Sequence, residues 1–150
     1  NGLSGEDFLR RIAEYFEVTL SPTPVRPELV REFGMYMAGQ WYRLRLDSVR
    51  VPLGDPVASL DVSLRLDLLL SPLLGIGDPR HDQRIDFVGG ARGLQGLSER
   101  IDSGEMAVGF SLFPTCMESL MAVADSGGLM PPKSTWFEPK LADGLVSHLI

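Results

Sequence analysis

The sequence has very few of the residues that form disulfides and metal clusters. Its one cysteine, Cys116, can form neither an internal disulfide nor a cysteine-rich zinc cluster. Its two histidines, His81 and His148, have no ligand spacing to a cysteine or to a carboxylate cluster. We therefore expect no metal site, and a single thiol favours a reducing, cytoplasmic location.

Positive charge and long apolar runs are also scarce. The chain has 14 Lys and Arg residues against 20 Asp and Glu residues, a formal net charge of −6, and no basic run that could neutralise nucleic-acid phosphates. Its longest apolar stretch, residues 68–76, is interrupted by Ser71, Pro72 and Gly75 and is shorter than the roughly 20 residues that span a bilayer. We expect neither a nucleic-acid nor a membrane partner.

The rest of the composition is typical of one globular domain. The 150 residues, 44% of them hydrophobic, can bury a core without disulfides or metals. We expect a single domain over residues 1–150. Because the chain begins with Asn1 rather than methionine, we also expect it to be a segment of a larger protein.

Apolar spacing predicts helices and a hairpin in the first half. The hairpin is the clearest element, because apolar side chains alternate on both sides of Gly39-Gln40, a possible two-residue turn. The expected elements are a helix from about Ser4, a strand over 18–20, the hairpin over 33–46, a helix over 62–70 and a short helix from Ser71 to Gly75.

In the second half, strands and helices are expected to alternate. We expect strands over 85–88, 106–113, 134–138 and 145–149, a helix over 92–102 and a helix opened by a capping box at Thr115–Glu118. Met117 and Met121 would face the core. A β-α-β-α-β-β order predicts parallel strands joined by right-handed crossovers. The expected fold is α+β: a mixed β-sheet with a βαβαβ core, antiparallel hairpins and packed helices.

The first candidate site is Gly89, Gly90 and Arg92, between an expected strand and helix. Glycines there let backbone N–H groups approach a phosphate, and the arginine adds a charged fork. The spacing matches neither of the common glycine-rich phosphate motifs. A tight strand-to-helix turn is the alternative interpretation.

The second candidate site lies in residues 130–140. The chain has twelve arginines but only two lysines, Lys133 and Lys140, and both fall in this segment. Lysine beside Ser134 and Thr135 is a combination that holds anions such as phosphate, and Pro131-Pro132 would stiffen the loop. The alternative is a proline-stiffened edge hairpin with solvent-facing lysines.

Parallel strands would collect these residues at one edge of the sheet, where ligands of open α/β sheets bind. The residues expected there are Gly89, Gly90, Pro114, Thr115, Glu138 and Lys140. Lys133 would lie at the opposite end of its strand, some 20 Å away at ~3.3 Å per residue. Cys116 would begin a helix, where a thiol can be activated, or would be a small buried residue.

Four segments resemble the C-terminal part of the domain-of-unknown-function 1015 family. They are Leu60-Asp61-Val62-Ser63-Leu64, Pro72-Leu73-Leu74-Gly75-Ile76, Arg84-Ile85-Asp86-Phe87-Val88-Gly89-Gly90 and, most specifically, residues 130–140. The resemblance extends from about Phe33 to Ile150. It implies a larger bacterial or archaeal protein whose upstream part carries an Asp-Gly-His-His-Arg-type motif, as in ParB/sulfiredoxin-like proteins, some of which are kinases of free serine.

Two functions follow as hypotheses. The segment completes a nucleotide-dependent small-molecule kinase, in which ATP or ADP binds the parent protein and Lys133 or Lys140 steadies phosphate charge. No cofactor is evident in the segment itself, and we expect it to be inactive alone. Alternatively, it is a non-catalytic structural or interaction module that docks the upstream N-terminal domain or a second copy as a homodimer.

Overall fold

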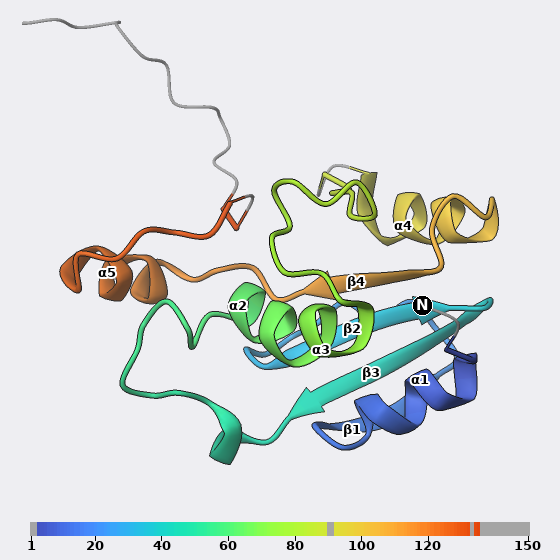
Figure 1. Ribbon diagram of the computed structural model, residues 1–150, viewed down its shortest axis with the longest axis horizontal. Coiled ribbons are helices and arrows are strands. Elements are labelled where there is room, and N and C mark those ends of the chain that lie inside the picture. Colours follow the sequence, from blue (N-terminus) through green and yellow to red (C-terminus); the bar gives the residue numbers. More distant parts are fainter. Residues whose placement is uncertain (1–2, 90–91, 133, 136–150) are drawn as a thin grey trace, which may run out of the picture.

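A four-stranded antiparallel sheet with helices on both faces forms the protein (Figure 1). The computed structural model describes residues 3–89, 92–132 and 134–135. The strands, β1 (Phe16–Ser21), β2 (Glu32–Met37), β3 (Gln40–Leu46) and β4 (Val108–Leu112), lie in the order β1-β3-β2-β4. The α+β class is therefore confirmed.

Helical segments lie before β1, in the long connection between β3 and β4, and after β4. They are α1 (Gly5–Ile12), the 3₁₀ turn η1 (Ser48–Arg50), α2 (Asp61–Arg65), the π-helical turn η2 (Leu66–Leu70), α3 (Ser71–Leu74), α4 (Gly93–Asp102) and α5 (Met117–Asp125). The expected helices over 62–70, 71–75 and 92–102 are confirmed within one or two residues at each end.

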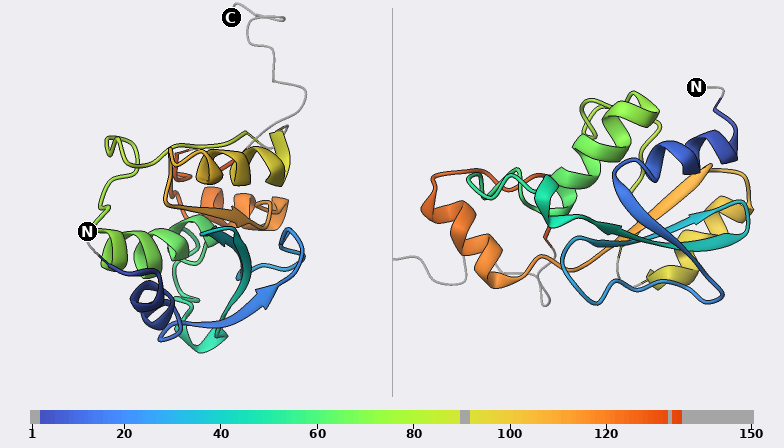
Figure 2. Two further views of the ribbon diagram at one scale, coloured as in Figure 1. Left: turned by 90° about the vertical axis from the view of Figure 1, so that its right-hand side faces the viewer. Right: turned by 90° about the horizontal axis from the view of Figure 1, so that it is seen from below.

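The two faces of the sheet carry different cores because side chains alternate along each strand. Phe33 and Met35 of β2 join Leu44 of β3 in a cluster with residues of α1, α2 and α3. On the opposite face, Tyr36 and Trp41 pack with residues of α4. Figure 2 shows α1 and the α2–α3 segment on one side of the sheet and α4 on the other. β2 is therefore buried on both faces.

The β2–β3 hairpin is confirmed, but its turn lies one residue earlier than expected. Met37 pairs with Gln40, so Ala38 and Gly39 form the loop, with φ angles of 49° and 78°. Positive φ at both loop residues matches the right-handed twist of the strands. A type I′ turn needs left-handed backbone at both positions, and glycine adopts that conformation without a steric penalty.

Glu32 places a carboxylate inside the second face of the sheet. Only 2% of this residue is exposed. Arg43 pairs with it across the β2–β3 register, and Arg45 Nη2 lies 3.4 Å from its second oxygen. Two guanidinium partners offset the loss of hydration, as a buried charge requires. The arginines of β3 thus face away from the leucine cluster, as the alternation predicts.

The π-helical turn sets the orientation of the whole α2–η2–α3 segment. Leu64, Leu69 and Leu73 are all buried in the cluster on the first face. The spacing of five between Leu64 and Leu69 is one residue longer than an α-helical turn. The extra residue is accommodated by the i→i+5 bond from the Ser71 N–H to the Leu66 carbonyl. Both leucines can therefore reach the same core.

The expected mixed sheet with a βαβαβ core is wrong for the described residues. Residues 85–88 form no strand, and β4 pairs antiparallel with β2. The 85–88 segment contains Asp86, whose carboxylate forms an ion pair with Arg100 of α4. The segment therefore lies beside α4 and not at an edge of the sheet. Of the expected strand over 134–138, Ser134 and Thr135 are not in a strand, and the rest lies outside the described residues, as does 145–149.

α5 is also oriented differently from the prediction. Met117 is 61% exposed and Met121 is 59% exposed, whereas Val123 is buried. Cys116 is the N-cap and makes no side-chain capping bond, so no capping box forms at Thr115. The helix lies beyond the end of β4, where it has little sheet surface to cover (Figures 1 and 2). Helical spacing alone therefore misidentified the buried side.

Leu69→Ala tests the dependence of the fold on the π-helical turn. Leu69 is fully buried, so truncation removes apolar contacts and leaves a cavity. We expect a loss of about 3 kcal/mol in the free energy of unfolding, measured by urea denaturation. Leu53→Ala, at a residue that is 77% exposed, is the matched control and should change stability by less than about 0.5 kcal/mol. Equal effects of the two substitutions would contradict this packing.

Candidate functional site

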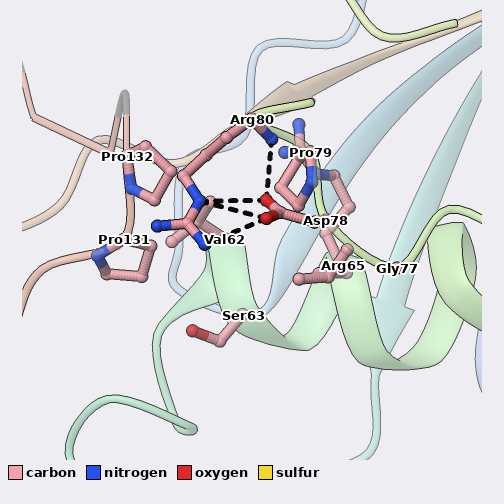
Figure 3. Close-up of a pocket in the computed structure, with 10 residues that line it drawn as sticks. Val62, Ser63, Arg65, Gly77, Asp78, Pro79, Arg80, Pro131 and Pro132 are labelled. Carbon is pink, nitrogen blue, oxygen red and sulfur yellow. Dashed lines mark hydrogen bonds and ion pairs between the residues drawn. The ribbon is translucent and has the colours of Figure 1, made fainter. Parts of the chain in front are cut away.

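A cavity of about 350 Å³ lies between α2, the turn that follows α3 and the Pro131-Pro132 segment (Figure 3). This volume is at the lower end of the ~300–1,000 Å³ typical of small-molecule sites. Its lining residues are Val62, Ser63, Arg65, Leu66, Gly77, Asp78, Pro79, Arg80, Pro131 and Pro132. Three segments far apart in the sequence thus meet at one site.

Helix α2 and the first residue of η2 bring four of the lining residues to one side of the cavity. Val62, Arg65 and Leu66 are three and four residues apart, the spacing that places side chains on one helix face. Leu64 lies between them in sequence but is buried in the core. The π-helical turn begins at Leu66, directly beside the cavity. Such turns are frequent at functional sites because they re-aim neighbouring side chains.

Among the described residues, no carboxylate forms an ion pair with Arg65 of this wall. Its Nε atom is buried and has no hydrogen-bond partner among the described residues. Burial lowers the pKa of Arg65 to about 10, which still leaves the guanidinium charged at neutral pH. A buried charged donor without an acceptor costs free energy. An anion in the cavity could supply the missing acceptor.

Arg80, in contrast, is already neutralised by Asp78. Arg80 Nε and Nη2 lie 3.0 and 2.9 Å from the Asp78 carboxylate, and its backbone N–H donates to the same group at 2.9 Å. His81 Nδ1 lies 2.9 Å from Asp78 Oδ2. The hydrogen bonds from Arg80 and then His81 hold the pKa of Asp78 well below its usual range. Figure 3 shows the Arg80 guanidinium between Asp78 and the two prolines.

The third wall of the cavity, Pro131-Pro132, belongs to residues 130–140, the second candidate site predicted from the sequence. Pro131 and Pro132 line the cavity, while the Ser134 hydroxyl donates to the Pro131 carbonyl at 2.6 Å. The Thr115 hydroxyl donates to the Ser134 carbonyl at 3.0 Å, which fixes this loop near α5. Thr135 is exposed. Lys133, Glu138 and Lys140 lie outside the described residues, so their roles stay predictions.

The first candidate site of the sequence does not line this cavity. The Gly89 carbonyl accepts the Arg92 N–H at 3.0 Å in the turn before α4, and both residues are exposed. Gly90 lies outside the described residues. The shared edge of parallel strands, which was expected to gather Gly89 with Thr115, does not exist because β4 is antiparallel to its neighbour. Anion binding at Gly89 and Arg92 stays a prediction without that support.

A second, smaller cavity of about 140 Å³ lies between the loop before β2 and the start of α5. Asp61 lines it and accepts the Arg31 N–H at 2.9 and 3.1 Å. Burial raises the pKa of Asp61 to about 6, more than the bond from Arg31 lowers it. Cys116 Sγ lies 3.1 Å from Ser119 Oγ on another wall. This cavity therefore contains a titratable carboxyl and a thiol.

Residues 1–63 match the model of a family described as "Protein of unknown function (DUF1015)". This N-terminal segment of the chain is therefore similar to that family. The match bears out the resemblance to the family, but it does not bear out the expected assignment to the family's C-terminal part, because it lies at the N-terminal end of the chain. No curated protein and no solved structure matches the chain.

The segment matched to the DUF1015 family ends inside α2 and includes Val62 and Ser63 of the cavity wall. Arg65 lies two residues beyond it. Within the described part of the chain, no helix has the length and apolar character to cross a bilayer. Nor does that part hold a cluster of three or more His, Cys, Asp or Glu side chains suited to a metal ion.

Sequence reasoning missed Arg65 and the Asp78–Arg80 pair. A signal for Arg65 was present, because it is the one charge among Val62, Leu64 and Leu66 on a helix assigned to the core. A charged residue in such a stretch is rarely buried without a partner. Asp78-Pro79 was recognised only as a turn, since no sequence pattern places that turn beside α2.

Arg65→Met separates a binding role of this side chain from a structural role. Because the substitution removes a buried, unpartnered donor, we expect the free energy of unfolding of the ligand-free protein to rise by about 1–2 kcal/mol. Urea denaturation at pH 7 measures the change. Arg10→Met, at a residue that is 75% exposed, is the control and should have little effect. A marked destabilisation by Arg65→Met would indicate a structural role.

The raised pKa of Asp61 predicts that this residue makes stability depend on pH. The folded protein holds the Asp61 proton more tightly than the unfolded chain, whose carboxyl titrates near 3.8. Its contribution is therefore complete below about pH 4 and is lost as the pH rises through 6. Allowing for partial exposure, we expect a loss of about 1–2 kcal/mol.

Asp61→Asn should remove that loss, because the amide oxygen can still accept the Arg31 N–H without titrating. Denaturant unfolding at pH 4 and pH 7 compares the two proteins. Asp47→Asn, at an exposed capping residue, is the matched control. The same pH dependence in wild type and Asp61→Asn would show that Asp61 is not the responsible group.

Proposed function

We propose that this protein is the acceptor-binding part of a small-molecule phosphotransferase, and that the cavity at Arg65 holds an anionic group of the acceptor. The observation that carries the proposal is the buried, unpartnered Nε of Arg65 in a ligand-sized cavity. Proteins place a charged donor in such a position at a cost in stability, and binding an anion recovers it. The π-helical turn beside Arg65 supports a functional role.

The reaction type rests on the sequence rather than on the cavity. The Pro131-Pro132 wall continues directly into Lys133, Ser134 and Thr135, a combination suited to phosphate. The family resemblance implies a nucleotide-dependent kinase with free serine as an acceptor, and catalytic residues upstream. In this proposal ATP or ADP donates the phosphoryl group, and a cytoplasmic location suits the thiol of Cys116.

An assay of the full-length parent protein tests the proposal. Phosphoryl transfer from ATP or ADP to free serine and to small hydroxy acids is measured for wild type and for Arg65→Met. We expect the substitution to raise the KM for the acceptor about 10-fold or more, because one charge-assisted contact contributes about 1.5–3 kcal/mol. Arg10→Met should behave as wild type. Absence of transfer to every acceptor, or an unchanged KM in Arg65→Met, would sink the proposal.

The interaction module is the second candidate, and the surface of α5 favours it. Met117 and Met121 are four residues apart on one face of the helix and largely exposed, and Leu129 is 86% exposed. Methionine-rich surfaces are adaptable binding surfaces. In that role the protein docks the upstream domain or a second copy. Sedimentation at increasing concentration, with Met121→Lys as the variant, distinguishes a homodimer from a monomer.

A further inference from the structure

Among the described residues that line the larger cavity, a single positive charge is unbalanced. Arg65 and Arg80 are the lining cations, and Asp78 is the lining anion. Three N–H groups of Arg80 donate hydrogen bonds to the Asp78 carboxylate, so that pair is neutral as a unit. Arg65 forms no ion pair with any described residue, and its Nε has no partner. The electrostatic complement of this wall is one negative charge.

The remaining lining is mostly apolar and rigid. Val62 comes from α2, Leu66 from η2, Pro79 from the turn, and Pro131 and Pro132 from the third wall. Figure 3 shows the Pro131-Pro132 pair on one side of the cavity and Pro79 on the other. Proline rings cannot rearrange around a ligand, so these walls are preformed. An apolar body gains free energy there, whereas a polar body loses hydrogen bonds to water.

We infer that the cavity binds a monoanionic carboxylate with a compact apolar body, and that the nucleotide polyphosphate binds elsewhere. This inference rests on the proposed function, because it names the acceptor class of the same site. A nucleoside triphosphate brings several negative charges to a wall that can balance only one. The free-energy cost of removing the other charges from water would therefore exceed the electrostatic gain of binding. Free serine offers a suitable carboxylate but presents its hydroxyl and ammonium groups to proline and leucine surfaces.

Calorimetric titration of the 150-residue protein with benzoate, serine and ATP tests the inference. We expect benzoate to bind about 10-fold more tightly than serine, since burying apolar area contributes ~25 cal/mol per Å². ATP should not displace benzoate. Arg65→Met should weaken benzoate binding about 10-fold or more, and Arg10→Met should leave it unchanged. Tighter binding of serine, displacement by ATP, or no benzoate binding would each overturn the inference.

Asp78→Asn provides a second variant that changes charge without touching Arg65. Releasing Arg80 raises the net charge of the wall by one, so the protein should shift its preference from benzoate towards the dianion phenyl phosphate by roughly threefold to tenfold. An unchanged ratio of the two affinities would contradict the charge argument. Far-UV circular dichroism confirms that each variant is folded.

The two proposals fail separately. If the parent protein phosphorylates serine and the protein binds serine more tightly than benzoate, the phosphotransferase proposal is supported and the inference of an apolar acceptor is wrong. Benzoate binding that depends on Arg65, with no transfer to any hydroxy acid in the parent protein, would leave the carboxylate site standing and remove the phosphotransferase.

Discussion

Burial of three leucines against one face of the sheet constrains the rest of the molecule. Leu64, Leu69 and Leu73 join Phe33 and Met35 in one core. Burying each leucine contributes about 2 kcal/mol, more than the modest penalty of one π-helical turn. With Leu64 facing the sheet, the next residue, Arg65, lies on another side of the helix. Arg65 is thereby directed towards the cavity rather than towards an acidic partner.

Glu32, which is buried, and Arg65, whose Nε atom is buried, show the contrast between compensated and uncompensated ionic groups. Glu32 is nearly inaccessible, yet Arg43 and Arg45 both pair with it, so its charge is compensated within the β2–β3 register. Arg65 has the opposite arrangement: its buried Nε lacks a partner in the described chain, and burial lowers its pKa. Natural proteins retain uncompensated charges chiefly where a ligand completes them. That difference singles out the cavity at Arg65.

The surface of the protein offers two chemically distinct environments for further partners. The Arg65 cavity combines one unbalanced cation with proline walls and suits a small acid. The exposed face of α5 combines methionines with a nearby exposed leucine and suits an apolar surface. The Thr115–Ser134 bond joins the two regions, because it fixes the segment that follows Pro132 beside the start of α5.

The sequence by itself determined the local elements and the α+β class. The β2–β3 hairpin, the helix that begins at Asp61 and the glycine that ends α3 follow from alternation, helical spacing and left-handed backbone, which are properties of a few neighbouring residues. The expected role of Asp61 as the N-cap is wrong, because Leu60 holds that position and Asp61 is the first residue of the helix. Short motifs also indicated a resemblance to the DUF1015 family, and residues 1–63 match the model of that family.

Only the tertiary structure decided the direction of β4, the exposed side of α5 and the meeting of α2 with Asp78 and Pro131. Strand direction depends on which partner is available, and β2 already lies beside β3, so β4 occupies its other edge antiparallel to it. The cavity depends on contacts between residues more than 60 positions apart. Local sequence patterns carry no information about such distances, because the free energy that selects them comes from the packing of the whole chain.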